Sequence, residues 1–294
     1  MSTEVLTLSN GRLIAWYECG DVNSTLPSIF VFHSFPGSRF GGKLWHDLAL
    51  NYGLRTISPD RPGTGLSTHD PHRTLLSYPA DILELADYLQ IPQFKVLGSG
   101  EGGPYVLACL KVLSKDRCLG GQIVSGIYPF KLGIRGMAWG RRILIAWMYW
   151  MPSFFGSMMD RRFGKAARNP NPQVFKELIM RGFKTLPEPD RKAIEDEAFV
   201  EIMVEAKREG FRQGRDSISK EASLYTSDWG FELEDIECRD LCIWHGKLDA
   251  NVPFDMVQKA AGLLNGVETR FFDDEGHNVV MKHKEKILQR FLTK

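Results

Sequence analysis

Apolar residues recur along this chain with two different periods, one typical of strands and one of helices. Residues 28–33 (SIFVFH) form a nearly continuous apolar run, which predicts a strand buried on both faces. Residues 78–89 instead place Ile82 and Leu85 at helical spacing. The two patterns alternate over most of the chain, and this alternation predicts a mostly parallel sheet with helices on both faces.

The other expected elements follow the same order. Two early strands at 5–8 and 13–18 flank the turn signal Asn10-Gly11. Further strands are expected at 55–58, 94–97, 121–125, 241–245 and 269–272, and further helices at 44–51 and 103–113. Ligands gather at the carboxyl ends of strands in such sheets, so functional residues are expected in the loops that follow the strands.

The strand pattern is interrupted between residues 129 and 229, where the chain has helical character and several prolines. Its apolar run at 143–152 is far shorter than the roughly 20 residues that a bilayer span needs. We therefore expect a core made of residues 1–128 and 230–294, with a helical cap, 129–229, inserted in it. Most aromatic and methionine residues of the cap are expected to serve packing.

A few of these apolar residues are candidates for the wall of a hydrophobic substrate pocket. The candidates in the cap are Trp139, Trp147 and Trp150, and Ser34, which follows the strand at 28–33, is added from the core. Their orientation decides which substrate fits, and the sequence does not give it.

Composition excludes several classes of partner. Over the whole chain 37 basic residues balance 36 acidic ones, so neither a nucleic-acid footprint nor a polybasic membrane signal is expected. The five cysteines are unclustered, and no His, Cys or carboxylate group has metal-ligand spacing, so we expect no metal and no cofactor. Residues 1–4 do not resemble a signal peptide and 292–294 match no peroxisomal address, which favours a cytoplasmic protein without stable membrane insertion.

The most informative motif lies between the strand at 94–97 and the helix at 103–113. The run Gly98-Ser99-Gly100-Glu101-Gly102 has the setting of the G-x-S-x-G nucleophile elbow, but its central residue is Gly100, which has no side chain. The run also spells the dinucleotide fingerprint G-x-G-x-x-G. We reject that interpretation, because the motif lies deep in the chain and the next strand ends at Ile123-Val124-Ser125 without the expected carboxylate.

Four further motifs follow strands in the same manner. They are His33-Ser34-Phe35-Pro36-Gly37, Asp60-Arg61-Pro62-Gly63, His245-Gly246-Lys247-Leu248-Asp249 and Glu275-Gly276-His277-Asn278. With the elbow, they resemble the α/β-hydrolase superfamily, in the capped branch that holds esterases, epoxide hydrolases and lyases. The resemblance covers nearly the whole chain outside the cap.

The resemblance implies an α/β-hydrolase fold with a mostly parallel eight-stranded sheet. In that superfamily the nucleophile, the acid and the histidine follow in chain order. This order implies Asp249 as the acid and His277 as the base, with Gly100 at the vacant nucleophile position. The backbone N–H groups of Phe35 and Glu101 are the implied oxyanion hole.

Three functions remain open on the sequence alone. A His–Asp pair is a competent general base without a serine, so the chain fits a non-covalent enzyme, of hydrolase, lyase or cyclase type, that acts on a small hydrophobic carbonyl or ester compound. It also fits a conventional serine esterase inactivated by a serine-to-glycine change at position 100. A non-catalytic protein that binds a small molecule is the third interpretation. The sequence leaves the oligomeric state open.

Overall fold

One sheet of eight strands organises the computed structural model, which describes residues 3–184 and 186–293. The strands lie in the order β1-β2-β4-β3-β5-β6-β7-β8. Their bounds are β1 (Thr3–Thr7), β2 (Leu13–Gly20), β3 (Ser28–Phe32), β4 (Arg55–Pro59), β5 (Phe94–Ser99), β6 (Cys118–Val124), β7 (Leu241–Gly246) and β8 (Glu268–Phe272). Strand β2 is antiparallel to β1 and β4, and the other pairs are parallel. The predicted mostly parallel eight-stranded sheet is confirmed.

The parallel strands contribute side chains to two hydrophobic cores, one on each face of the sheet. On β3, Phe30 belongs to the larger core, whereas Ile29 and Val31 belong to the smaller one. On β5, Val96 belongs to the larger core and Leu97 to the smaller one. Both faces of these strands are therefore apolar, which explains why the sequence shows continuous apolar runs rather than alternation.

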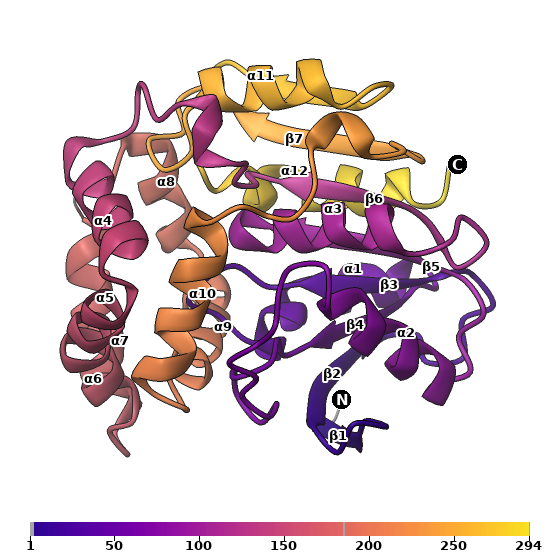
Figure 1. Ribbon diagram of the computed structural model, residues 1–294, viewed down its shortest axis with the longest axis horizontal. Coiled ribbons are helices and arrows are strands. Elements are labelled where there is room, and N and C mark those ends of the chain that lie inside the picture. The colour runs from indigo at the N-terminus through magenta and orange to yellow at the C-terminus, as the bar shows by residue number, and fades with distance from the viewer. Residues whose placement is uncertain (1–2, 185, 294) are drawn as a thin grey trace.

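Helices cover both of these faces (Figure 1). The larger core contains residues of α2 (Tyr78–Tyr88), α3 (Gly103–Val112) and α11 (Phe254–Leu263). The smaller core contains residues of α1 (His46–Asn51) and α12 (Val279–Arg290). Because β4, β3 and β5 to β8 run parallel, their carboxyl ends lie at one common edge of the sheet.

Between β6 and β7 the described chain is helical, and we call the stretch from Trp139 to Thr226 the helical insertion. Its helices are α4 (Trp139–Trp150), α5 (Pro152–Met159), α6 (Lys165–Ala167), α7 (Pro172–Phe183), α8 (Glu188–Lys192), α9 (Glu197–Gly210) and α10 (Arg215–Thr226). The insertion has a hydrophobic core of its own, with Phe175 and Phe211 buried in it. It stands beside the sheet rather than over its faces (Figure 1).

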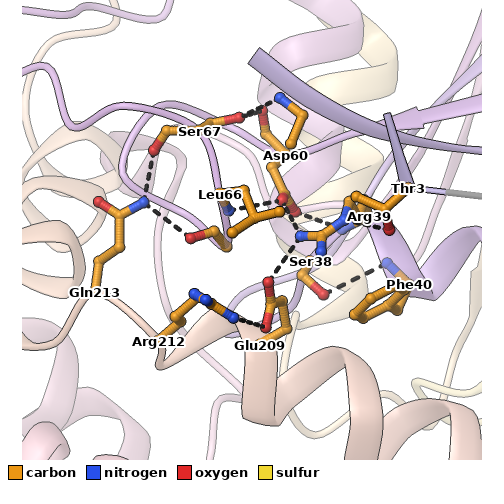
Figure 2. A network of polar contacts seen from close by, with 12 residues as sticks. Thr3, Ser38, Arg39, Phe40, Asp60, Leu66, Ser67, Glu209, Arg212 and Gln213 are labelled. Atoms are coloured by element: carbon orange, nitrogen blue, oxygen red, sulfur yellow. Dashed lines mark hydrogen bonds and ion pairs between the residues drawn. The ribbon is translucent and has the colours of Figure 1, made fainter. Parts of the chain in front are cut away.

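A polar network attaches the insertion to the sheet (Figure 2). The Arg39 guanidinium forms an ion pair with Asp60, which follows β4. It forms a second ion pair with Glu209 of α9, at a distance of 2.9 Å. Burial raises the pKa of Asp60 to about 6, although Arg39 opposes this rise. Nearby, the Gln213 amide donates a hydrogen bond to the carbonyl of Ser67 (2.6 Å). These contacts hold α9 against the loops at the carboxyl edge of the sheet.

Several predicted boundaries differ from the observed ones by one to three residues. The strand expected at 121–125 is β6, which already pairs with β5 at Cys118, ahead of a register shift. The helix expected at 44–51 becomes α-helical only at His46. Before it, a 3₁₀ helix (Arg39–Trp45) is capped by the Ser38 hydroxyl, which accepts a hydrogen bond from the backbone N–H of Phe40 (3.4 Å). Among the described residues, no helix is long and apolar enough to cross a membrane.

Candidate active site

The turn between β5 and α3 has the backbone of an elbow. Gly100 has a φ of +55°, in the left-handed region that favours glycine. The flanking glycines are required by close packing: a Cβ on Gly98 would lie 2.5 Å from the carbonyl oxygen of Gly102, and one on Gly102 would lie 2.2 Å from that of Phe32. The sequence therefore builds a tight strand-to-helix turn that presents position 100 at its apex.

Position 100 faces the predicted base. An ideal Cβ on Gly100 would stand 3.3 Å from the Cβ of Ser34 and 4.0 Å from Nε2 of His277. A side-chain oxygen one bond further out would lie within hydrogen-bond reach of Nε2. The structure thus brings Gly100, Ser34 and His277 together, and Gly100 presents no side chain to His277.

His277 is oriented by Asp249. The Nδ1 of His277 lies 2.8 Å from Oδ2 of Asp249, while Oδ1 of Asp249 accepts backbone N–H groups of Asn251 (2.7 Å) and Val252 (2.9 Å). The Ser125 hydroxyl, at the end of β6, donates to the carbonyl of His277 (2.6 Å). This arrangement leaves Nε2 of His277 facing position 100.

The pair is also coupled electrostatically. Burial alone would lower the pKa of His277, but the charge and hydrogen bond of Asp249 outweigh burial and raise it above 6.5. Burial would raise the pKa of Asp249, but His277 outweighs it and holds that pKa below 3.8. His245 lies 3.6 Å from Asp249, and burial lowers its pKa, so it stays neutral and forms no ion pair there.

A second carboxylate lies in the predicted oxyanion hole, and the sequence analysis missed it. The backbone N–H of Phe35 donates a hydrogen bond to Oε2 of Glu101 at 3.0 Å. One of the two predicted donors is therefore occupied by the side chain of the residue that supplies the other. Glu101 lies in the 3₁₀ turn Gly100–Gly102 between β5 and α3, beside the loop after β3, and no sequence motif reports this contact.

Lys207 of α9 lies close to this carboxylate. Its Nζ donates to the carbonyl of Pro36 (3.3 Å), one residue beyond Phe35. Burial lowers the pKa of Lys207, and the charge of Glu101 opposes that shift. The insertion thus supplies a cation next to the oxyanion loop, which the sequence analysis did not assign.

The oxyanion loop rests on a buried charge network. Arg61 donates to the carbonyls of His33 (2.5 Å) and Ser34 (3.4 Å), and its guanidinium pairs with Glu221 of α10 (3.1 Å). Glu221 also pairs with Arg73, and both arginines and Glu221 are buried. Burial would raise the pKa of Glu221, but the two arginines outweigh it and lower it to about 2. A helix of the insertion thereby fixes the backbone of the oxyanion loop.

The four predicted pocket residues occupy different places. Ser34 lies beside position 100, as described above. Trp147 is half-buried and packs against the core of the insertion and against Phe154. Trp139 and Trp150 are each 76% exposed, so most of the surface of both side chains faces solvent.

Among residues 3–184 and 186–293, no group of three His, Cys, Asp or Glu side chains could hold a metal ion. The five cysteines are free thiols, and four of them are buried. The ionisable side chains that the site brings together are those of His277, Asp249 and Glu101.

The family model described as alpha/beta hydrolase fold matches residues 27–284. This chain belongs to the α/β-hydrolase fold family. The match runs from the start of β3 into α12, so this α/β-hydrolase has the elbow, Asp249 and His277 all within the matched region. The family predicted from the motifs is confirmed.

Solved structures resemble this α/β-hydrolase over its whole length. An esterase from Exiguobacterium antarcticum is 20% identical with a TM-score of 0.67, covering 100% of this chain and 98% of its own. A bromoperoxidase from Bacillus anthracis is 18% identical (TM-score 0.66, 100% of both chains). An enol-lactonase from Burkholderia xenovorans LB400 is 16% identical (TM-score 0.64, 99% of this chain and 100% of its own). None of the curated proteins matches the sequence. At these identities the likeness shows the fold alone.

Proposed function

We propose that this chain is an enzyme that acts on a small hydrophobic carbonyl or ester compound without a covalent intermediate, with His277 and Asp249 as its general base. The helical insertion serves as the cap over this site. One observation carries the proposal: Nε2 of His277 is directed, at 4.0 Å, at the point where a side chain of residue 100 would begin. A base held in this way can act on whatever small group lies beside Gly100.

The reaction balances without a serine. A water in the space beside Gly100 attacks the carbonyl carbon, and Nε2 of His277 takes its proton. The carbonyl electron pair moves to oxygen, which becomes an oxyanion, while Asp249 stabilises the imidazolium through Nδ1 (2.8 Å). When the carbonyl re-forms, the leaving oxygen takes the proton back from His277. Abstraction of a substrate C–H or O–H proton by the same nitrogen would give lyase or cyclase chemistry.

The oxyanion needs the donor that Glu101 now occupies. In this proposal the substrate oxygen displaces the Glu101 carboxylate from the N–H of Phe35, and the carboxylate turns to the nearby Lys207 cation. The N–H groups of Phe35 and Glu101 then stabilise the developing charge. The Phe35 ring, which contacts Tyr225 of α10 at 5.9 Å between centroids, is apolar surface for the substrate.

The experiment is turnover of aryl esters and lactones of increasing acyl length by the unmodified protein and by His277→Ala. The proposal predicts measurable turnover that His277→Ala abolishes, while replacement of the exposed His72 by alanine leaves it unchanged. Equal turnover in His277→Ala and the unmodified protein would refute His277 as the base.

The same assay gives a pH dependence. His277 acts as a base only when neutral, and its pKa is raised above 6.5 in the fold. Turnover should therefore fall as pH drops, with a midpoint above 6.5. Asp249→Asn removes the charge that raises this pKa, so it should lower the midpoint as well as the rate. A midpoint that does not move in Asp249→Asn would contradict the assigned pairing.

A serine esterase inactivated at position 100 is the second candidate. The left-handed turn at Gly100 and its distance from His277 favour it, because both suit a serine nucleophile. In that case the unmodified protein would be inactive on every ester and Gly100→Ser would hydrolyse them. If neither form turns over but an apolar ester raises the melting temperature, the chain is a binding protein.

A further inference from the structure

The outer face of α4 and α5 is apolar and unusually exposed. Large side chains with between 46% and 76% of their surface exposed gather within sixteen residues; they are Trp139, Tyr149, Trp150, Met151 and Phe154. Both helices lie at the edge of the molecule that is far from the sheet (Figure 1). Exposed aromatic groups in such a cluster mark an interaction surface rather than ordinary scatter.

Helical geometry aligns these residues. Trp139, Arg142, Ala146 and Trp150 follow one another at spacings of three and four, so they share one face of α4, and all of them are exposed. The opposite face contains Leu144 and Met148, which pack against the core of the insertion. The inner face therefore packs against the rest of the insertion, whereas the outer face has no such cover.

The stretch of chain that contains this apolar face is rich in basic residues. Residues 131–168 contain eight basic residues and one acidic residue, a net charge of +7, whereas the whole chain has +1. The rest of the chain is therefore at −6. The near-neutral total conceals a strong local excess of positive charge, which the composition alone did not reveal.

Most of these cations have no carboxylate partner. Asp160, the acidic residue, is paired with Arg168 (2.7 Å), and Lys131 pairs with Glu232. Within the described part of the chain, the cations of this stretch that form no salt bridge are Arg135, Arg141, Arg142, Arg161, Arg162 and Lys165. Arg161 and Arg162 line an open hollow of about 640 Å³ together with Phe154, so charge and aromatic surface adjoin directly.

We propose that the α4–α5 face docks on an anionic phospholipid membrane, with its aromatic side chains at headgroup depth and its arginines on lipid phosphates. Tryptophan and tyrosine prefer the interface between headgroups and acyl chains, and juxtaposed arginines attract anionic lipid. The −6 charge of the remaining chain is repelled by the same surface, which orients the molecule with this face inward. Docking on the surface requires no helix that spans the bilayer.

A second copy of this chain fits the face poorly. A two-fold dimer built on it would bring the same patch together with itself and set its exposed arginines, Arg142, Arg161 and Arg162, against their own copies. A membrane of opposite charge meets no such repulsion. Charge complementarity therefore selects anionic lipid as the occupant.

Sedimentation with vesicles tests the proposal without any need for an enzymatic substrate. The full chain is mixed with vesicles of phosphatidylcholine alone, or with about one-third phosphatidylserine, and the bound fraction is measured. We expect binding to the anionic vesicles, weakened by added salt, and little binding to phosphatidylcholine. Trp139→Ala/Trp150→Ala and Arg161→Glu/Arg162→Glu should each weaken binding about tenfold or more.

Matched controls separate docking from general charge or fold effects. Lys284→Glu/Lys286→Glu makes the same charge change on α12, and Tyr88→Ala removes an exposed aromatic ring from α2; neither should change binding. Circular dichroism checks that each variant is folded. Absence of binding to anionic vesicles, or equal loss in the controls, overturns the proposal. A dimer in solution that Trp139→Ala/Trp150→Ala dissociates, with no vesicle binding, assigns the face to a second copy instead.

Discussion

At the scale of single residues, Gly100 decides which chemistry is accessible. Its φ of +55° suits glycine, and any other residue there costs about 1–2 kcal/mol of backbone strain. The elbow is otherwise complete around it, because Gly98 and Gly102 allow the close turn and Nε2 of His277 faces position 100. Glycine therefore relieves strain at the site where a hydrolase would have its nucleophile.

Replacing Gly100 with serine should create a serine hydrolase at a cost in stability. The new hydroxyl would lie within reach of His277, so we expect labelling by a fluorophosphonate and stoichiometric acylation by aryl esters. The free energy of unfolding should fall by about 1–2 kcal/mol, measured by urea titration. Gly11→Ser is the matched control, since Gly11 has a φ of +82° and open space around it. It should lose similar stability without labelling, and absence of labelling in Gly100→Ser would contradict the geometry assigned to His277.

Glu101 should restrain oxyanion chemistry at this site. Its carboxylate occupies the Phe35 N–H at 3.0 Å and opposes negative charge on a substrate oxygen. In the Gly100→Ser background, Glu101→Ala should raise kcat/KM for aryl esters about tenfold, because loss of a single oxyanion donor costs far more than that. Glu188→Ala, an exposed position on α8, is the control. A fall in kcat/KM on Glu101→Ala would instead give this carboxylate a direct part in the reaction.

At the scale of elements, α10 is tied to the sheet by a buried charge rather than by apolar contact alone. Glu221 is 1% exposed, and Arg61 and Arg73 beside it are equally buried. Its pKa of about 2 lies below 4.5, so its ionised form stabilises the fold above pH 4.5, and that contribution is lost as pH falls toward 2.

Glu221→Gln should destabilise the protein by about 3–5 kcal/mol at neutral pH, because it leaves two buried arginines without their counter-charge. Urea unfolding measures this. In the control, Glu188→Gln breaks an exposed pair with Lys192 (3.2 Å) and should cost less than about 1 kcal/mol. Equal costs in the two variants would show that the Glu221 network does not hold α10 in place.

The sequence predicted the elements well because hydrophobic period and glycine placement are local signals. Strand β3 and helix α2 follow the apolar patterns that indicated them, and the motifs lie after the strands as expected. The contacts of Glu101 with Phe35 and of Glu221 with Arg61 join residues 66 and 160 positions apart. No period or motif reports such contacts, because they depend on side-chain reach once the fold has formed.

The sequence also did not predict which of the tryptophans of α4 are exposed to solvent. Trp139, Trp147 and Trp150 are alike in type and lie on one helix, yet Trp147 packs against the insertion while the other two face outward. A helix with apolar residues on several faces does not reveal which face is covered, since that depends on its neighbours.

At the scale of the whole molecule, the sheet and the insertion supply different residues to the candidate site. The carboxyl edge of the sheet gathers Gly100, Asp249 and His277, and the insertion approaches that edge with Lys207 and Glu221. The central claim of this account is that the assembled site activates a substrate or water through His277 without forming a bond to the protein.

Rapid mixing with an aryl ester, followed by intact-mass spectrometry during turnover, tests that claim most directly. The account predicts linear product release without a burst and a protein mass that stays unmodified, because no residue at position 100 can be acylated. Gly100→Ser under the same conditions should show a burst and an acyl adduct. A burst with an adduct on Ser99, His277 or any other residue of the unmodified protein would contradict the account.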